Sequence, residues 1–152
     1  MNRNIVGFHR DDLGDWVAEL DCGHGQHVRH QPPFVSRPWT EAGRDSMLGT
    51  PLACRRCERL ELPEGVERYR STPEFDQDTV PRGLTRAHRT AKGVWGVIEV
   101  MEGRLGYVLE DGTNRHFELD AGTPGVVVSE MPHRVEPRGP VRFRVHFYRR
   151  SD

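Results

Sequence analysis

Four residues in the first third of the chain have the types and the spacing of a zinc site. Cys54 and Cys57 form a Cys-x-x-Cys pair, which can present two thiolates to one ion from a single turn. Cys22 and His24 form a second pair inside a glycine-containing turn. Because four Cys and His ligands close the coordination shell of zinc, the sequence predicts a structural rather than a catalytic ion held by these four residues.

The identity of the fourth ligand is open at this point, because His27 and His30 lie close to His24 in the sequence and compete with it. The alternative interpretation is three ordinary buried thiols and a surface histidine. The chain has 3 cysteines, and this odd number argues against a disulfide framework.

The elements that must position this cluster are short strands and turns. Residues 3–9 and 16–20 predict a β-hairpin with Gly14 near its tip, and residues 26–30 predict a third strand. A short helix is expected near residues 45–48, and one helical turn should follow the Cys-x-x-Cys pair. The proline and glycine of residues 62–65 predict a linker.

The second half of the chain is rich in strand formers and turn dipeptides. Glu102-Gly103 and Asp111-Gly112 are expected to be turns, and Val141, Phe143, Val145 and Phe147 alternate on one face, with His146 on the other. Many short strands at this spacing predict a sandwich or a barrel. The expected strands are 95–101, 105–109, 115–119, 126–128, 133–135 and 141–148.

Length and charge limit the classes of function. A chain of 152 residues holds one domain or two small ones, and a formal net charge of −1 does not suit a general nucleic-acid binder. The sequence has neither a secretory signal nor an apolar run of the ~18 residues that a membrane span needs. We therefore expect a cytoplasmic protein that binds neither nucleic acid nor membrane.

The N-terminal part contains a set of short motifs: Gly7-Phe8-His9, Gly14 to Leu20, Cys22 to His30, Pro32-Pro33, Arg37-Pro38-Trp39 and the Cys54-x-x-Cys57 pair. On these motifs it resembles a small bacterial zinc-knuckle domain family of unknown function, which implies a shared module and no activity. The cluster's two ligand pairs, set between a hairpin and a helical turn, are also similar to a zinc ribbon or treble clef.

The second half of the chain contains a further set of motifs: Thr72 to Phe75, Val80-Pro81-x-Gly83-Leu84, His88 to Gly96, Glu102-Gly103-x-Leu105 and Pro132 to Val135. On these motifs, residues 70–150 resemble the cupin domain that is linked to tellurite resistance, which occurs alone or joined to a methyltransferase. It implies a double-stranded β-helix and a second divalent metal, bound by His88 and His133 with His146 as a third candidate. It does not imply methyl transfer, because no pattern for binding S-adenosylmethionine is present.

These observations predict a mainly β protein with a zinc-binding module at residues 1–61 and a cupin barrel at residues 67–152. The favoured function is a stress-response-type metal-binding module whose barrel takes a metal, an oxyanion or a small molecule. One alternative is a metal-dependent cupin enzyme that acts on a small molecule, and another is a protein-docking module. A homodimer through the cupin domain is also expected.

Overall fold

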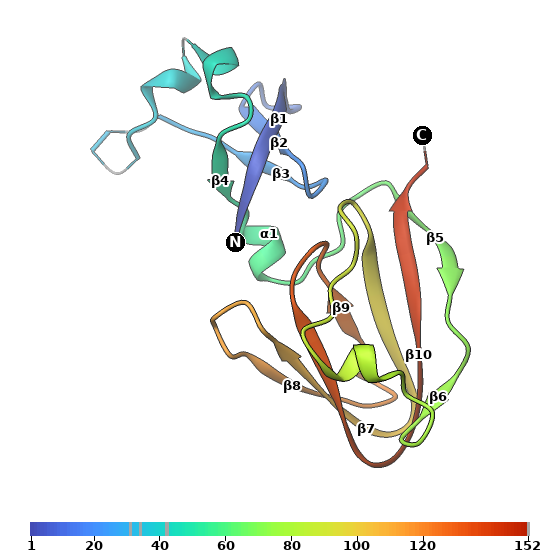
Figure 1. Ribbon diagram of the computed structural model, residues 1–152. Helices are drawn as coiled ribbons and strands as arrows, with labels where there is room; N and C mark the ends of the chain where they lie inside the picture. The colour runs from blue at the N-terminus through green and yellow to red at the C-terminus, as the bar shows by residue number, and fades with distance from the viewer. Residues whose placement is uncertain (31, 34, 42, 152) are drawn as a thin grey trace. The chain divides into compact units, whose positions relative to one another are not determined.

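The computed structural model describes residues 1–30, 32–33, 35–41 and 43–151 and is mainly β (Figure 1). The chain divides into two compact units, Met1–Glu64 and Gly65–Asp152. The predicted domains, 1–61 and 67–152, each fall within one unit, although residue 152 lies outside the described residues. None of the described helices is long and apolar enough to cross a membrane.

The first unit is built on an antiparallel sheet in the order β3-β2-β1-β4. The predicted hairpin is present, since β1 pairs with β2 from Arg10 opposite Trp16 onward. Asp11 shapes the hairpin turn because its side chain accepts the N–H groups of Leu13 and Asp15, each at 2.9 Å. The strands are β1 (Asn2–Arg10), β2 (Trp16–Leu20), β3 (Gly25–His27) and β4 (Pro51–Ala53).

The first unit has short helices and a small core. The helices are η1 (Pro38–Thr40), η2 (Arg44–Met47) and α1 (Arg55–Glu58). Apart from the cysteines, the buried apolar side chains among the described residues of this unit are Ile5, Val17, Ala18, Leu20 and Val28. So few apolar side chains bury little surface, and domains of this size commonly need a metal or disulfides for stability.

The second unit is one curled sheet organised around two long antiparallel strands. β7 (Trp95–Leu109) pairs with β10 (His133–Arg150) along almost their full length. The first half of β7 also pairs with β9, its second half pairs with β8, and the second half of β10 pairs with β5 and β6. The shorter elements are β5 (Val66–Ser71), β6 (Phe75–Asp76), η3 (Arg82–Thr85), β8 (His116–Leu119) and β9 (Gly125–Val127).

The expectation of separate strands on either side of Glu102-Gly103 was wrong, because β7 continues through it. Likewise the expected strands 133–135 and 141–148 are one strand, β10. Both strands turn over where the register shifts between Pro137 and Val141 (Figure 1). Gly103 has φ of +77° at this bend, a conformation open to glycine, so the chain changes direction without ending the ladder.

The bend folds the sheet onto itself and encloses the core of the second unit. Burial alternates from Gly96 to Met101 of β7 and from Val141 to Val145 of β10, whereas residues 105–109 of β7 are all buried. Among the described residues of this unit, the largest fully buried apolar side chains include Trp95, Ile98, Leu105, Tyr107, Leu109, Leu119 and Phe143. The curled sheet thereby creates an inner face, where a cavity is found, and an outer face.

Candidate functional site

The four predicted zinc ligands come together in the first unit. Cys22 and His24 lie in the turn between β2 and β3, and Cys54 directly follows β4. Cys57 is carried by α1, which begins next to Cys54. Gly23, with φ of +95°, lets the first turn bend sharply between its two ligands.

The ligand atoms are spaced as one zinc ion would require. The distance from His24 Nδ1 is 3.5 Å to Cys22 Sγ, 3.5 Å to Cys54 Sγ and 3.4 Å to Cys57 Sγ, and the two sulfurs of Cys22 and Cys54 are 3.8 Å apart. Bonds of about 2.3 Å to sulfur and 2.0 Å to nitrogen in a tetrahedron give about 3.8 Å between sulfurs and about 3.5 Å between sulfur and nitrogen. The cluster therefore fits a metal such as zinc.

Neighbouring groups fix the orientation of the ligands. His24 Nε2 donates to the carbonyl oxygen of Glu61 at 2.7 Å, which leaves Nδ1 unprotonated and directed at the sulfurs. Cys57 N–H lies 3.4 Å from Cys54 Sγ and donates to it. These contacts are the usual outer partners of a bound metal and position the cluster before the ion enters.

The thiols oppose one another's ionisation when no metal is bound. The contact with Cys54 Sγ is the main cause that raises the pKa of Cys22 to about 11, and the neighbouring sulfurs of Cys22 and Cys54 raise the pKa of Cys57. Hydrogen bonds from the Cys22 and Cys57 thiols lower the pKa of Cys54. A bound divalent cation would remove this conflict, because its charge stabilises several thiolates at once.

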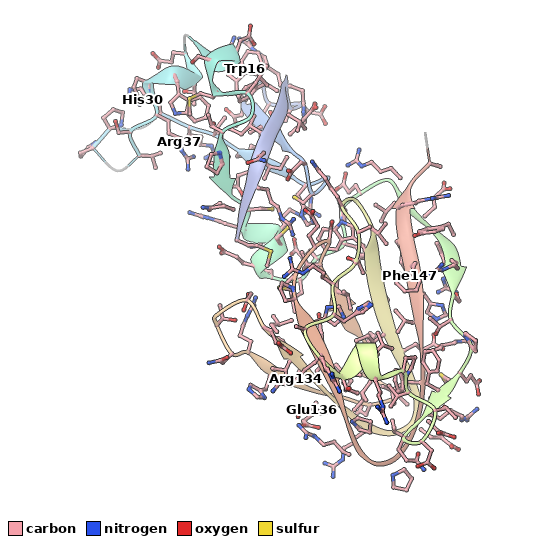
Figure 2. The ribbon with its side chains drawn as sticks, in the orientation of Figure 1. Trp16, His30, Arg37, Arg134, Glu136 and Phe147 are labelled. Atoms are coloured by element: carbon pink, nitrogen blue, oxygen red, sulfur yellow. The ribbon has the colours of Figure 1, made fainter. Side chains whose placement is uncertain are left out.

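The competing histidines are engaged elsewhere. His27 Nε2 lies 2.8 Å from Asp11 Oδ2. His30 Nδ1 accepts the N–H of Arg37 at 2.9 Å, and both of these residues are labelled in Figure 2. The cluster's own side chains are nearly closed to solvent, with His24 exposed by only 1%. The geometry of the described residues thus favours His24 as the fourth ligand of a buried, four-coordinate site.

A second candidate site lies on the inner face of the curled sheet. His88 and His133 are distant in the sequence, yet their backbones exchange two hydrogen bonds of 2.8 Å and their rings are 5.3 Å apart. Both line a cavity of about 30 Å³, large enough for a water molecule or a single ion. The other lining residues are Thr72, Leu84, Thr90, Ile98, Val127, Val135, Phe143, Val145 and Phe147.

Burial favours the neutral form of both imidazoles of this cavity. Removal from water is the main cause that lowers the pKa of His88 and of His133. His133 Nδ1 donates to the carbonyl oxygen of Met131 at 3.0 Å, so its Nε2 carries a lone pair. His88 Nδ1 is buried and has no hydrogen-bond partner within the described part of the chain. Two neutral nitrogens in an apolar cavity can bind a metal ion or a small polar ligand.

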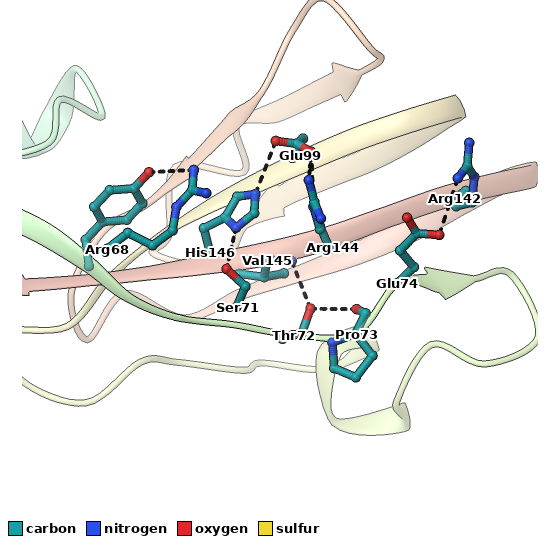
Figure 3. Close-up of polar contacts among 11 residues, drawn as sticks. Arg68, Ser71, Thr72, Pro73, Glu74, Glu99, Arg142, Arg144, Val145 and His146 are labelled. Atoms are coloured by element: carbon teal, nitrogen blue, oxygen red, sulfur yellow. Dashed lines mark hydrogen bonds and ion pairs between the residues drawn. The ribbon is translucent and has the colours of Figure 1, made fainter.

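The third candidate, His146, is not brought to this cavity. Phe143, Val145 and Phe147 line it, so His146 projects from the opposite face of β10. There its imidazole contacts Ser71 and Glu99, two residues that sequence analysis did not single out (Figure 3). They lie on β5 and β7, and no local motif in the sequence links them to β10.

Each unit matches a known family. Residues 6–61 match the family described as "protein of unknown function" (DUF3565), and residues 70–145 match the TehB-like domain. No curated protein matches the chain.

The solved structures that resemble this chain show its fold. One is TehB from Haemophilus influenzae, which is 21% identical with a TM-score of 0.53 over 57% of this chain and 32% of TehB. Another is a protein from Escherichia coli strain K12, which is 23% identical with a TM-score of 0.52 over 60% of this chain and 98% of that one. The chain therefore spans about a third of TehB and nearly all of the E. coli protein.

Proposed function

Because the chain belongs to the TehB-like domain family, we propose that it is a stress-response-type metal-binding protein with two separate sites. The first unit holds a structural zinc. The second unit is a cupin barrel that binds one small ligand, of the size of a single metal ion, between His88 and His133. The two units fold independently, which agrees with the match of the E. coli protein over nearly its whole length.

The zinc assignment is carried by the agreement between the sulfur and nitrogen distances and a tetrahedral ion. Binding free energy at such sites is on the order of 10 kcal/mol and contributes directly to folding of a small domain. The four ligands leave no position for substrate, so this zinc stabilises the unit and takes no part in chemistry.

The cupin assignment is supported by the way β7 and β10 bend together and close the sheet around its core. The inner face then provides two imidazole nitrogens and no lining carboxylate among the described residues. Two imidazoles leave coordination positions for water or an anion, which suits reversible binding better than a permanent structural metal. The lack of a carboxylate also argues against the alternative of a metal-dependent enzyme, since many such sites include one.

Metal analysis of the full chain, purified without added metal, tests both sites. Cys57→Ser should lose one equivalent of zinc and the thermal transition of the first unit, while the second unit remains folded. His133→Ala should retain that zinc and lose a second, exchangeable divalent metal. His116→Ala, which changes an exposed histidine of β8, is the matched control and should bind as the wild type does.

The possible results separate the two parts of the proposal. Full zinc content in Cys57→Ser would refute the structural zinc site. Equal metal content in wild type, His133→Ala and His116→Ala would refute the barrel metal, and a metal-free ligand such as an oxyanion would then be the occupant to test by calorimetry.

A further inference from the structure

Three polar side chains from neighbouring strands meet on the outer face of the curled sheet, away from the cavity. His146 of β10 lies opposite Ser71 of β5 in the strand register, and β7 carries Glu99 on the other side of β10 (Figure 3). Strand order β5-β10-β7 therefore places the histidine between a hydroxyl and a carboxylate. Neither the zinc cluster nor the cavity uses these residues.

The contacts within this group define the protonation of the imidazole. His146 Nε2 lies 3.1 Å from Glu99 Oε2, and Ser71 Oγ lies 2.6 Å from His146 Nδ1. Because a carboxylate only accepts hydrogen bonds, Nε2 carries the proton and Nδ1 presents a lone pair to the Ser71 hydroxyl. This is the electronic arrangement of a serine–histidine–acid triad, with the roles of the two ring nitrogens exchanged relative to serine proteases.

We propose that Ser71 is a nucleophilic serine, activated by His146 and positioned through Glu99, that attacks small activated acyl esters. The surroundings support a reactive group rather than a passive hydrogen bond. Ser71 is exposed on β5, the strand at the end of the sheet, whereas His146 is only 2% exposed, so the nucleophile is reachable and the base is shielded. A shielded imidazole with a fixed partner keeps its orientation toward the hydroxyl.

Arg144 holds the carboxylate of the group in place. Its Nε and Nη2 donate to Glu99 Oε1 at 3.1 and 2.9 Å, which leaves Oε2 for His146. The hydrogen bond from His146 is the main cause of the lowered pKa of Glu99, and the bonds from Arg144 add to it. Glu99 therefore remains an anion and a positioning residue, able to stabilise the imidazolium that forms when His146 takes a proton.

The positively charged side chain of Arg68, on the same face, indicates the kind of ester. Arg68 lies opposite Tyr148, two residues beyond His146 on β10, so Arg68 and Ser71 share the outer face. Its guanidinium donates to the Tyr148 hydroxyl at 3.3 Å, and the Arg68 residue is exposed to solvent. It can attract an ester that carries a negative charge.

The reaction balances with water as the only other reactant. Ser71 Oγ forms a bond to the acyl carbon while its proton passes to His146 Nδ1. The bond from that carbon to the leaving oxygen breaks, and the imidazolium returns the proton to the leaving group. Water, deprotonated by His146, then cleaves the Ser71 ester and regenerates the hydroxyl.

Acylation of the full chain by p-nitrophenyl acetate is the first test. Wild type should release a burst of about one equivalent of nitrophenol, with acetyl found on Ser71 by mass spectrometry. Ser71→Ala should abolish the burst, and His146→Gln should slow it by about 10²-fold or more, the usual contribution of a general base. Ser151→Ala, which changes an exposed serine outside this group, is the control and should behave as the wild type does.

A thiol at the same position provides a readout that a merely structural hydrogen bond would not change. Ser71→Cys should react with iodoacetamide faster than Ser151→Cys at pH 7, and His146→Gln should remove the difference. Mono-p-nitrophenyl succinate should acylate Ser71 faster than the neutral acetate, and Arg68→Ala should reduce this preference. Acetylation spread over lysines and histidines, or equal thiol reactivity at 71 and 151, would overturn the proposal even if both metal sites are correct.

Discussion

Substitution of Gly103 tests whether the bend of β7 and β10 determines the second unit. A methyl group at this position would lie 2.2 Å from the carbonyl oxygen of Pro140 and 3.0 Å from Cα of Val141, and both neighbours are backbone atoms. Real side-chain carbons are essentially never found below 3.0 Å, so Gly103→Ala requires the two strands to move apart where they turn over.

Two costs add in Gly103→Ala. The positive φ of +77° costs a non-glycine residue about 1–2 kcal/mol, and steric overlap in a packed site costs about 1–3 kcal/mol more. We therefore expect a loss of about 2–5 kcal/mol in the free energy of unfolding of the second unit, which is a large part of the stability of a small domain.

Gly139→Ala is the matched control, because Gly139 lies at the same bend with φ of +81°, and a methyl group there would meet no atom of the described residues within 4 Å. Gly139→Ala should lose only the conformational cost of the positive φ, about 1–2 kcal/mol in the free energy of unfolding. Hydrogen exchange in increasing urea, followed on peptides of β7 and β10, gives the free energy for this unit alone. Equal losses in the two variants would refute the conclusion that close strand contact at Gly103 creates the curled sheet.

Three further predictions concern the cavity histidines, the core of the second unit and the Cys/His cluster. Burial lowers the pKa of His88 and His133 from the usual 6.5, so the unfolded chain binds more protons than the folded chain in acid. The metal-free second unit should therefore lose stability as pH falls below about 6.5. In urea titrations from about pH 7.5 to 5, the free energy of unfolding should fall less steeply in His133→Ala than in wild type. Tyr107→Phe removes the 2.8 Å hydrogen bond to the Val126 carbonyl and should cost about 1–3 kcal/mol in urea unfolding, and a wild-type midpoint would contradict that contact. EDTA should release zinc and make all three thiols reactive toward a disulfide reagent, and equal reaction rates with and without EDTA would count against a metal.

The Cys/His cluster, which could hold a metal such as zinc, could be predicted from the sequence because its members form two short pairs. A Cys-x-His pair and a Cys-x-x-Cys pair each present two ligands from a single turn, so spacing alone restricts which atoms can share an ion. The choice of His24 over His27 and His30 required the structure, since only the fold shows that the latter two contact Asp11 and the Arg37 backbone.

The β content and the opposite parity of His146 from Phe143, Val145 and Phe147 were also readable, because alternation along a strand has a period of two. Which of the two faces lines the cavity was not, so His146 stood as a third candidate ligand until the structure placed it on the outer face. The continuity of β7 could not be predicted from the sequence, because Glu102-Gly103 has the composition of a turn. Only long-range pairing with β10 keeps the ladder intact through this dipeptide.

The sequence by itself determined which residue types were available and which lay within one turn or one strand. Tertiary structure decided the placement of Ser71 and Glu99 on either side of His146, and it brings together His88 and His133, which only the family resemblance had paired. Such contacts depend on strand order and register, which arise from closing the whole sheet around its core and leave no signal in the local pattern.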